Sequence, residues 1–268
     1  MGVVLFLVGC SEAEGSTNEK IEEEITLKFA QVVPENHPWF EHGDQVFIDK
    51  VEELSEGMIT IEHYPDGQLG GASDMISLAR NGTVDIVFAA PSYISGDMPL
   101  STVLTLPQAI PDAEVGTLLS WDLISDKNST IYETDFENNG LVPLYSGVFP
   151  LFQILTIEPF SSLDDLQGMR FRSAGGTQDL IAEAINTIPV QLDRSEVYQS
   201  LQRNTIDGGL FTLNTVISNK THEVTNHFAT NANLTAFLGA VEISENTWNN
   251  LPTEAQEILA EAGETAVK

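Results

Sequence analysis

The sequence has a single cysteine and few basic residues. Its one cysteine, Cys10, excludes an intrachain disulfide and a cysteine-rich metal site. Lysine and arginine number 11 against 40 aspartates and glutamates, which gives a formal net charge of −29. Nucleic acids and anionic surfaces repel so acidic a protein, so we expect no nucleic-acid partner. Any anion site on this chain therefore needs a dedicated cation.

Motifs of catalysis and of cofactor binding are also missing. The chain has no Gly-x-Ser-x-Gly nucleophile turn and no glycine loop of the form that cradles phosphate. Its five histidines show no zinc-like spacing. Asp164 and Asp165 form a carboxylate pair, but the pair falls in a short capped turn, where we expect it to be solvated. We therefore predict that the protein is not an enzyme and holds no metal or cofactor.

The N-terminal segment is predicted to be a targeting signal and not part of the folded domain. Residues 1–10 form an apolar run that is too short to span a membrane. They are typical of the end of a secretory signal, and Leu-Val-Gly-Cys at 7–10 resembles a bacterial lipobox that would lipidate Cys10. An accidental apolar start is the alternative. Residues 11–24 are polar, which predicts a flexible tether on an extracytoplasmic, lipid-anchored or periplasmic protein.

Two similar phrases, at 78–88 and 201–211, indicate that the chain contains two similar halves. Each phrase ends a helix-like stretch at Arg-Asn and enters an apolar segment after an aspartate, Asp85 or Asp207, which we expect to brace the loop. Two α/β lobes with a ligand crevice between them are the natural arrangement at this length. We expect lobe 1 mainly at 25–150, lobe 2 mainly at 151–240, and a helical region at 241–268 that packs across both lobes.

Hydrophobic periodicity predicts alternating strands and helices in both halves. In the first half, the order is strand, helix, strand, helix, strand, at 25–32, 39–54, 58–64, 72–80 and 85–90. This order is typical of a mostly parallel sheet. Further strands are expected at 141–145, 153–157, 169–172, 189–192 and 207–213, and further helices at 113–124, 177–185, 196–203 and 249–266.

Four phrases resemble the signatures of one family. They are Tyr-Pro-Asp-Gly-Gln-Leu-Gly-Gly at 64–71, Ala-Arg-Asn-Gly-Thr-Val-Asp-Ile at 79–86, Leu-Asp-Asp-Leu-Gln-Gly-Met-Arg-Phe-Arg at 163–172 and Glu-Val-Tyr-Gln-Ser-Leu-Gln-Arg-Asn-Thr-Ile-Asp-Gly at 196–208. In this order they resemble the DctP-type extracytoplasmic solute receptors of tripartite ATP-independent periplasmic (TRAP) transporters. The resemblance runs from about residue 26 to the end of the chain.

The resemblance implies a two-lobed α/β fold like that of periplasmic binding proteins. That fold has mostly parallel sheets, crossover strands and a long helix that spans both lobes. It also implies a receptor that closes on a small organic acid and docks on a TRAP permease in the membrane, without catalysis. Because the family usually continues as helix, the C-terminus is expected to be truncated. Two alternatives stay open, a ligand sensor for a signalling partner and a binding protein of an ABC-type importer.

Arg172 is the expected partner of the ligand carboxylate. It matches the family arginine in that role, and it is one of only five arginines in the chain. It ends a β-rich segment and enters Ser-Ala-Gly-Gly at 173–176, small residues that permit close approach. The planar guanidinium fits a carboxylate with two hydrogen bonds. The alternative is an ordinary exposed strand arginine.

Phenylalanines stand at two positions where the family usually has polar ligand contacts. Phe211 replaces the usual asparagine after the Asp-Gly phrase, and Phe152 falls near the place of a second arginine. A crevice lined by rings favours apolar or aromatic ligands over hydroxyl-rich ones. We therefore predict a monocarboxylate with a hydrophobic or aromatic body. The alternative is that both rings belong to the core.

Further candidates lie near the ends of predicted strands, where α/β sheets bind ligands. Gln31, Asn36 and His37 follow the first strand, and Ser92 and Tyr93 follow the strand at 85–90. Phe149 precedes the expected crossover between lobes, and Asn214 could supply the amide that Phe211 replaces. The full set of predicted ligand-binding residues is Arg172, Phe211, Phe152, Gln31, His37, Ser92, Tyr93, Phe149 and Asn214.

Overall fold

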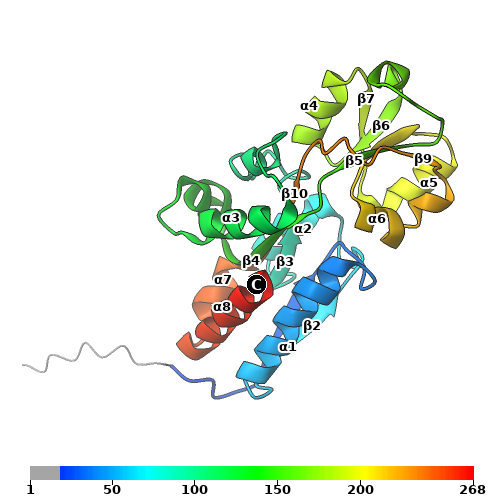
Figure 1. Cartoon of the computed structure of the whole chain (residues 1–268). Helices are drawn as coiled ribbons and strands as arrows, with labels where there is room; N and C mark the ends of the chain where they lie inside the picture. Colours follow the sequence, from blue (N-terminus) through cyan, green and yellow to red (C-terminus); the bar gives the residue numbers. More distant parts are fainter. Residues whose placement is uncertain (1–18) are drawn as a thin grey trace, which may run out of the picture.

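The computed structural model describes residues 19–268, which form two α/β lobes joined by crossing segments (Figure 1). Each lobe is built on a five-stranded sheet, with strand order β2-β1-β3-β10-β4 in the first and β7-β6-β8-β5-β9 in the second. Cys10 and most of the predicted tether lie outside the described residues. The two-lobed α/β fold is thus the one that the sequence predicts.

The first lobe begins with the predicted β-α-β-α-β unit. Strands β1 (Ile25–Ala30), β2 (Ile59–Tyr64) and β3 (Ile86–Ala89) are connected through α1 (Gln45–Leu54) and α2 (Met75–Arg80). β1 pairs in parallel with both β2 and β3. All four residues of β3 are buried because both faces pack in hydrophobic clusters, Ile86 and Phe88 in one and Val87 and Ala89 in another.

Two antiparallel strands complete the first sheet. β10 (Phe237–Ser244) lies between β3 and β4 (Leu141–Phe149) and runs antiparallel to both. The sheets are therefore mixed rather than mostly parallel, since a strand that returns from the other lobe enters in the opposite direction. The sequence analysis missed β10 and expected helix from residue 241. All eight β10 residues are buried, so their apolar run carries no alternation that marks a strand.

The second lobe repeats the topology of the first. β6 (Arg170–Ser173) pairs in parallel with β7 (Ile188–Gln191) and β8 (Gly208–Phe211) through α4 (Thr177–Ala184) and α5 (Val197–Gln202). The antiparallel strands here are β5 (Gln153–Thr156) and β9 (His227–Phe228). One helix was not predicted, α6 (Leu213–Ser218), which begins where the expected strand at 207–213 ends.

The repeat aspartates brace equivalent loops in the two lobes. Asp85 accepts a hydrogen bond from the backbone N–H of Lys28 at 2.9 Å, and Asp207 accepts one from the backbone N–H of Arg170 at 2.8 Å. The Arg170 side chain also pairs with Asp207, which lowers the pKa of that carboxyl. Both aspartates tie a repeat's third strand to its first, so the predicted structural role is confirmed.

The chain crosses between the lobes at residues 150–152 and 229–236. These two segments pair with each other, because the Phe152 N–H donates to Thr235 O at 2.8 Å and the Leu234 N–H donates to Phe152 O at 3.0 Å. The crossing therefore places Phe152 between the lobes.

The C-terminal helices pack on the first lobe. α7 (Glu245–Asn250) precedes α8 (Thr253–Val267), which contacts α1 and β4 (Figure 1). Gly263 lets α8 lie against the backbone of Leu144, where a Cβ would clash. The expected packing of 241–268 across both lobes is thus not what these contacts show. The buried α8 residues, Ala255, Leu259, Ala262 and Gly263, face first-lobe elements instead.

The end of the predicted tether is held in place rather than free. The Ile21 N–H donates to Glu254 of α8 at 2.8 Å, and the Glu254 N–H donates to Glu19 O at 3.1 Å. Ile21 also packs against the core. The tether expectation for 11–24 is therefore wrong at its last residues, because one apolar side chain and the open N-terminus of α8 give them partners.

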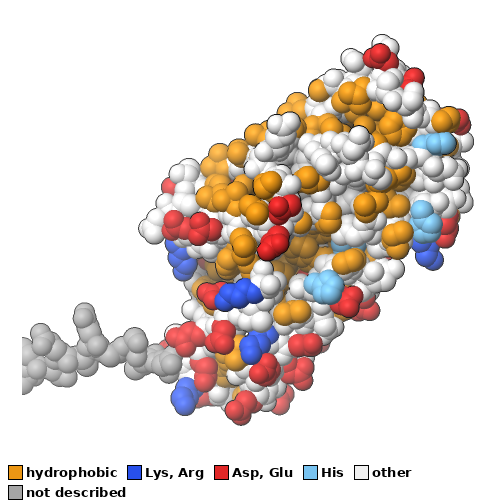
Figure 2. Space-filling model, in the orientation of Figure 1, with side chains coloured by type: hydrophobic (Ala, Val, Ile, Leu, Met, Phe, Trp, Pro, Cys, Tyr) orange, Lys and Arg blue, Asp and Glu red, His pale blue; other side chains and the backbone are white. Residues whose placement is uncertain are grey.

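The remaining elements are a helix and short helical turns. α3 (Ala113–Ser125) packs on β4. The turns are η1 (Phe40–Asp44), η2 (Ala72–Asp74), η3 (Ser101–Thr105), η4 (Tyr132–Phe136), η5 (Glu137–Asn139), η6 (Leu163–Leu166), η7 (Arg194–Glu196) and η8 (Thr221–Glu223). Within residues 19–268, none of the helices combines the length and apolar character needed to cross a membrane. Figure 2 shows acidic side chains crowding the end of the first lobe that carries α1 and α8.

Candidate ligand-binding site

A crevice between the lobes holds most of the predicted site residues. It encloses about 690 Å³ of empty space including its mouth, and residues of both lobes line it. Arg172, Phe211, Phe152, His37, Tyr93 and Phe149 all line this crevice. The structure thus brings together residues that are up to 174 positions apart in sequence, from His37 to Phe211 (211 − 37 = 174).

Aromatic rings form much of the crevice wall. Phe149 and Phe237 lie opposite each other on β4 and β10, with ring centres 5.2 Å apart in an edge-to-face arrangement. Phe237 also lies 6.0 Å from Tyr93 and 5.8 Å from Phe152. Phe88 on β3 lines the same wall. Sequence reasoning missed Phe88 and Phe237, because both sit in continuously apolar strands where the residue facing the crevice has no distinguishing pattern.

Arg172 is buried in the crevice and makes no direct ion pair among the described residues, although the charge of Asp193, which lines the same crevice, interacts with it at longer range. It lies on β6 and is 5% exposed. Its guanidinium donates to the Tyr93 hydroxyl, and its Cζ lies 5.8 Å from the centre of the Tyr93 ring and 5.9 Å from that of Phe211. Among residues 19–268, no carboxylate oxygen lies within 4.0 Å of its nitrogens, and Nε has no hydrogen-bond partner. By contrast, Arg170 on the same strand pairs with Asp207 at 2.6 Å.

The glycines after Arg172 allow the lobes to approach each other. Gly175 has φ +96°, and a Cβ there would lie 2.9 Å from Ser92 O of the first lobe. Gly176, with φ +56°, lies near the same carbonyl. Gly175 and Gly176 therefore make room for the backbone of the opposite lobe, a close approach of the kind that the sequence predicts.

A second arginine, Arg194, joins the lobes at the crevice. From η7 in the second lobe, its Nε donates to Val32 O of the first lobe at 3.1 Å, and its Nη2 pairs with Asp66 of the first lobe. Nη1 donates to Asn219 in its own lobe. Its acceptors lie 162, 128 and 25 residues away, so nothing in the local sequence marks this arginine as an inter-lobe contact.

Three predicted site residues do not line the crevice. Gln31 is buried in a polar network, and the Asn214 side chain accepts a hydrogen bond from the Thr215 N–H at 2.9 Å. Ser92 is buried with its hydroxyl unpaired. The weaker candidate Asn36 is exposed. Each of these residues does follow a strand, as predicted. The local turn, however, directs its side chain into the protein interior or into solvent and not into the crevice. Thr212 and Thr215 line the wall near Asn214 instead.

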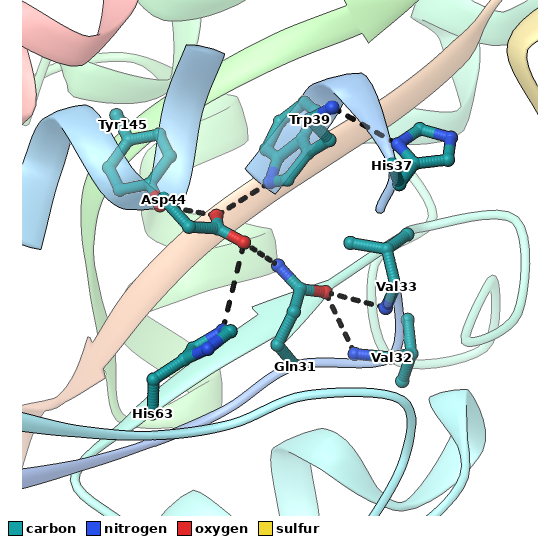
Figure 3. A network of polar contacts seen from close by, with 8 residues as sticks. All are labelled: Gln31, Val32, Val33, His37, Trp39, Asp44, His63 and Tyr145. Carbon is teal, nitrogen blue, oxygen red and sulfur yellow. Dashed lines mark hydrogen bonds and ion pairs between the residues drawn. The ribbon is translucent and has the colours of Figure 1, made fainter. Parts of the chain in front are cut away.

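The network around Asp44 supports the crevice wall from behind (Figure 3). Asp44 is fully buried and accepts hydrogen bonds from Gln31 Nε2 at 2.8 Å, Trp39 Nε1 at 2.7 Å and the Tyr145 hydroxyl at 2.7 Å. Burial raises the pKa of Asp44 to about 7 even though these hydrogen bonds act to lower it. The network fixes Trp39, whose ring stacks on Phe149 at 5.1 Å.

His37 is the one histidine among residues 19–268 that lines the crevice. It is 1% exposed, and its ring centre lies 5.3 Å from that of Phe149. Its Nδ1 accepts a hydrogen bond from the Trp39 backbone N–H at 3.1 Å (Figure 3). Burial, and then the charge of Arg194, lowers the pKa of His37 to about 4, so the ring is neutral near pH 7.

Comparison with known proteins identifies the class to which this fold and crevice belong. The family model of bacterial extracellular solute-binding protein, family 7 (DctP) matches residues 29–268. The chain therefore belongs to this family, whose members are solute-binding receptors of TRAP transport systems rather than enzymes. The C4-dicarboxylate-binding protein DctB of Bacillus subtilis is a relative with 28% identity over 249 residues, covering 91% of this chain and 69% of its own length.

Solved structures share the fold. A marine metagenome TRAP solute-binding protein specific for aromatic acid ligands, in complex with 3-hydroxybenzoate, matches with a TM-score of 0.83 and 24% identity, over 91% of this chain and 76% of its own. A TRAP solute-binding protein from Rhodoferax ferrireducens in complex with copurified benzoate matches with a TM-score of 0.82 and 24% identity, over the same shares.

Proposed function

We propose that this protein is an extracytoplasmic receptor for a monocarboxylate with an aromatic or hydrophobic body. The acid would bind between the lobes, and the closed receptor would deliver it to a TRAP-type membrane permease. The observation that carries the proposal is Arg172, a permanently charged side chain buried in the crevice with no carboxylate of the described residues within 4.0 Å.

A ligand carboxylate would supply the direct, hydrogen-bonded ion pair that Arg172 lacks. The desolvation of a buried charge is costly unless the charge is paired, and a bidentate carboxylate restores both the charge balance and the hydrogen bonds. The unpaired Nε supports this role, since it leaves a buried donor for an incoming oxygen. The interaction is stronger in a closed crevice than at a surface because water is excluded.

The rings of the wall favour an aromatic or apolar body. Phe211 and Tyr93 flank the guanidinium, and Phe149, Phe152 and Phe237 continue the wall away from it. A sugar acid would leave its hydroxyl groups against rings that cannot pair with them. Two solved structures with this fold hold benzoate and 3-hydroxybenzoate, which agrees with this ligand class.

A dicarboxylate fits this crevice less well. The second arginine that lines it, Arg194, already contacts Asp66, Asn219 and the Val32 carbonyl. A second ligand carboxylate would therefore have to displace an inter-lobe ion pair. For this reason we favour a monocarboxylate, although the Bacillus subtilis relative is named for C4-dicarboxylates.

A thermal-shift screen of the purified protein against a panel of organic acids tests the ligand class. An acid that binds only the folded state at a hundredfold excess over its dissociation constant stabilises it by about 2.7 kcal/mol, and so raises the melting midpoint. We expect shifts with benzoate and other apolar monocarboxylates. Shifts confined to sugar acids or dicarboxylates would contradict the proposed ligand class.

Lipid anchoring through Cys10 and delivery to a permease complete the proposal. The lipobox-like residues 7–10 support lipidation, and family membership supports a TRAP permease as partner. Mass spectrometry of the membrane-extracted protein should find Cys10 modified by lipid, and an unmodified cysteine would contradict the anchor. Uptake of the acid by vesicles containing the permease should depend on added receptor.

A further inference from the structure

The His37 ring is fixed in one protonation form. Its Nδ1 accepts the Trp39 N–H at 3.1 Å, so the proton of the neutral ring must be carried by Nε2. The Asp44 network holds Trp39 on the other side through its indole N–H. The orientation of the His37 ring is therefore set by the protein before any ligand binds.

The Nε2–H of His37 is a donor without an acceptor. Nε2 is buried and has no hydrogen-bond partner among the described residues. The residue itself lines the crevice and is 1% exposed. Because a buried donor that lacks a partner destabilises a fold, such a group in a ligand crevice indicates an acceptor supplied by the ligand.

His37 and Arg172 contact different rings of the aromatic wall. The His37 ring contacts Phe149 at 5.3 Å, Phe149 contacts Phe237 at 5.2 Å, and Phe237 contacts Tyr93 at 6.0 Å. Only Tyr93, at the end of this series, contacts the Arg172 guanidinium. The two unpaired donors, Arg172 Nε and His37 Nε2, thus lie beside different rings of the same wall.

We propose that His37 is a specificity-determining residue whose Nε2–H binds an oxygen on the body of the ligand. The ligand class is then narrower than an apolar monocarboxylate. It is an aromatic or apolar acid that carries a hydroxyl, ether or keto oxygen as well as its carboxylate. This inference rests on the proposed function, because it assumes that Arg172 binds the carboxylate.

Calorimetric titrations with matched acids test the inference. The probes are benzoate, which has no second oxygen group, and 3- and 4-methoxybenzoate, whose ether oxygen can only accept. One methoxy isomer should bind the wild type about tenfold more tightly than benzoate, as expected for one buried hydrogen bond. His37→Phe keeps a ring but removes the donor, so it should abolish this preference, measured within each protein as the ratio of methoxybenzoate to benzoate affinity. His37→Gln, which restores an N–H donor, should recover part of the preference.

The outcomes separate the two proposals. If His37→Phe weakens benzoate and both methoxy acids by the same factor, or if neither isomer exceeds benzoate in the wild type, the inference is wrong while the receptor remains. If none of these acids binds the wild type, or Arg172→Met leaves their affinities unchanged, the proposed function itself fails.

A spectroscopic measurement on the wild type covers the case in which the buried variant does not fold. Long-range ¹H–¹⁵N NMR of histidine-labelled protein should show His37 protonated on Nε2 alone before ligand is added. The Nε2–H signal should then shift with the methoxy acid and not with benzoate. Protonation on Nδ1, or equal shifts with both acids, would overturn the inference.

Discussion

Arg172 and Glu242 are both buried with polar atoms unpaired, but they lie in different surroundings. Arg172 lines the open crevice between the lobes. Glu242 lies on β10 between Val87 and Pro143, is 0% exposed, and has no hydrogen-bond partner for either oxygen. Arg172 cannot lose its charge in a protein, whereas burial raises the pKa of Glu242 well above its usual value.

This difference distinguishes a ligand-binding group from a buried, unpaired group that the fold can accommodate without a ligand. A carboxyl group in a closed core can be buried as its neutral form, so it needs no ligand to balance it. A guanidinium keeps its charge, and an anion that enters the crevice can form the direct ion pair that the protein does not supply. An unpaired polar group therefore indicates a ligand only where it faces a cavity and cannot shed its charge or its donor.

The largest expected effect is the loss of acid binding in Arg172→Met. Removal of a buried partner of an ion pair typically costs about 2–5 kcal/mol, so affinity for benzoate should fall by about thirtyfold or more in calorimetry. Arg170→Met on the same strand is the matched control, because Arg170 already pairs with Asp207 outside the crevice. Equal losses of affinity in the two variants would contradict the proposal that Arg172 in particular binds the ligand carboxylate.

A polar group placed in the wall should also weaken binding. Phe211→Asn removes a ring that lies 5.9 Å from the Arg172 Cζ and sets an amide against the ligand body. We expect benzoate affinity to fall by about tenfold, since an unpaired buried amide costs roughly 1–3 kcal/mol. Phe228→Asn, on β9 outside the crevice, should lower stability and leave affinity intact. Unchanged affinity in Phe211→Asn would reduce Phe211 to a core residue.

Replacement of Glu242 should raise stability instead of affecting binding. The folded state holds the Glu242 proton more tightly than the unfolded state, so wild-type stability falls as pH rises from about 4.5 towards the folded pKa. Glu242→Met should therefore stabilise the protein by about 1–3 kcal/mol near pH 7, with a smaller gain near pH 4. Urea melts at both values measure this, with the exposed Glu257→Met as control. Destabilisation at pH 7 would show that Glu242 has a partner in solution.

The smallest expected effect concerns the contact between the lobes. Arg194→Ala removes an ion pair whose side chains are 15% and 58% exposed, so solvent screening limits the loss to about 1 kcal/mol, or roughly fivefold in affinity. Small-angle scattering should show a more open unliganded protein. Arg203→Ala, an exposed arginine outside the crevice, makes the same change of charge. Equal effects of the two variants would show that net charge, and not the contact, is responsible.

The elements that were predicted from the sequence follow from local patterns, whereas several features that were not predicted depend on how the chain crosses between the lobes. The phrases containing Asp85 and Asp207 predicted the parallel unit of each lobe because helix and strand periods are local properties. Arg172 was predicted because it matches the arginine of a family phrase, and Phe211 because it replaces the asparagine that the family usually has. β10 and Phe237 were missed because their strand is buried throughout, and Arg194 was missed because its partners lie in the other lobe. Gln31 was placed after the right strand, but its amide is taken up by Asp44.

The most direct test of the account compares benzoate with benzamide in calorimetric titrations of the wild type. The two ligands have nearly the same shape, and only benzoate carries the charge that Arg172 is proposed to bind. Benzoate should bind at least about thirtyfold more tightly than benzamide, in line with the roughly 2–5 kcal/mol expected for a buried charge pair. Equal affinities would show that the crevice does not recognise a carboxylate, and would contradict the role of Arg172.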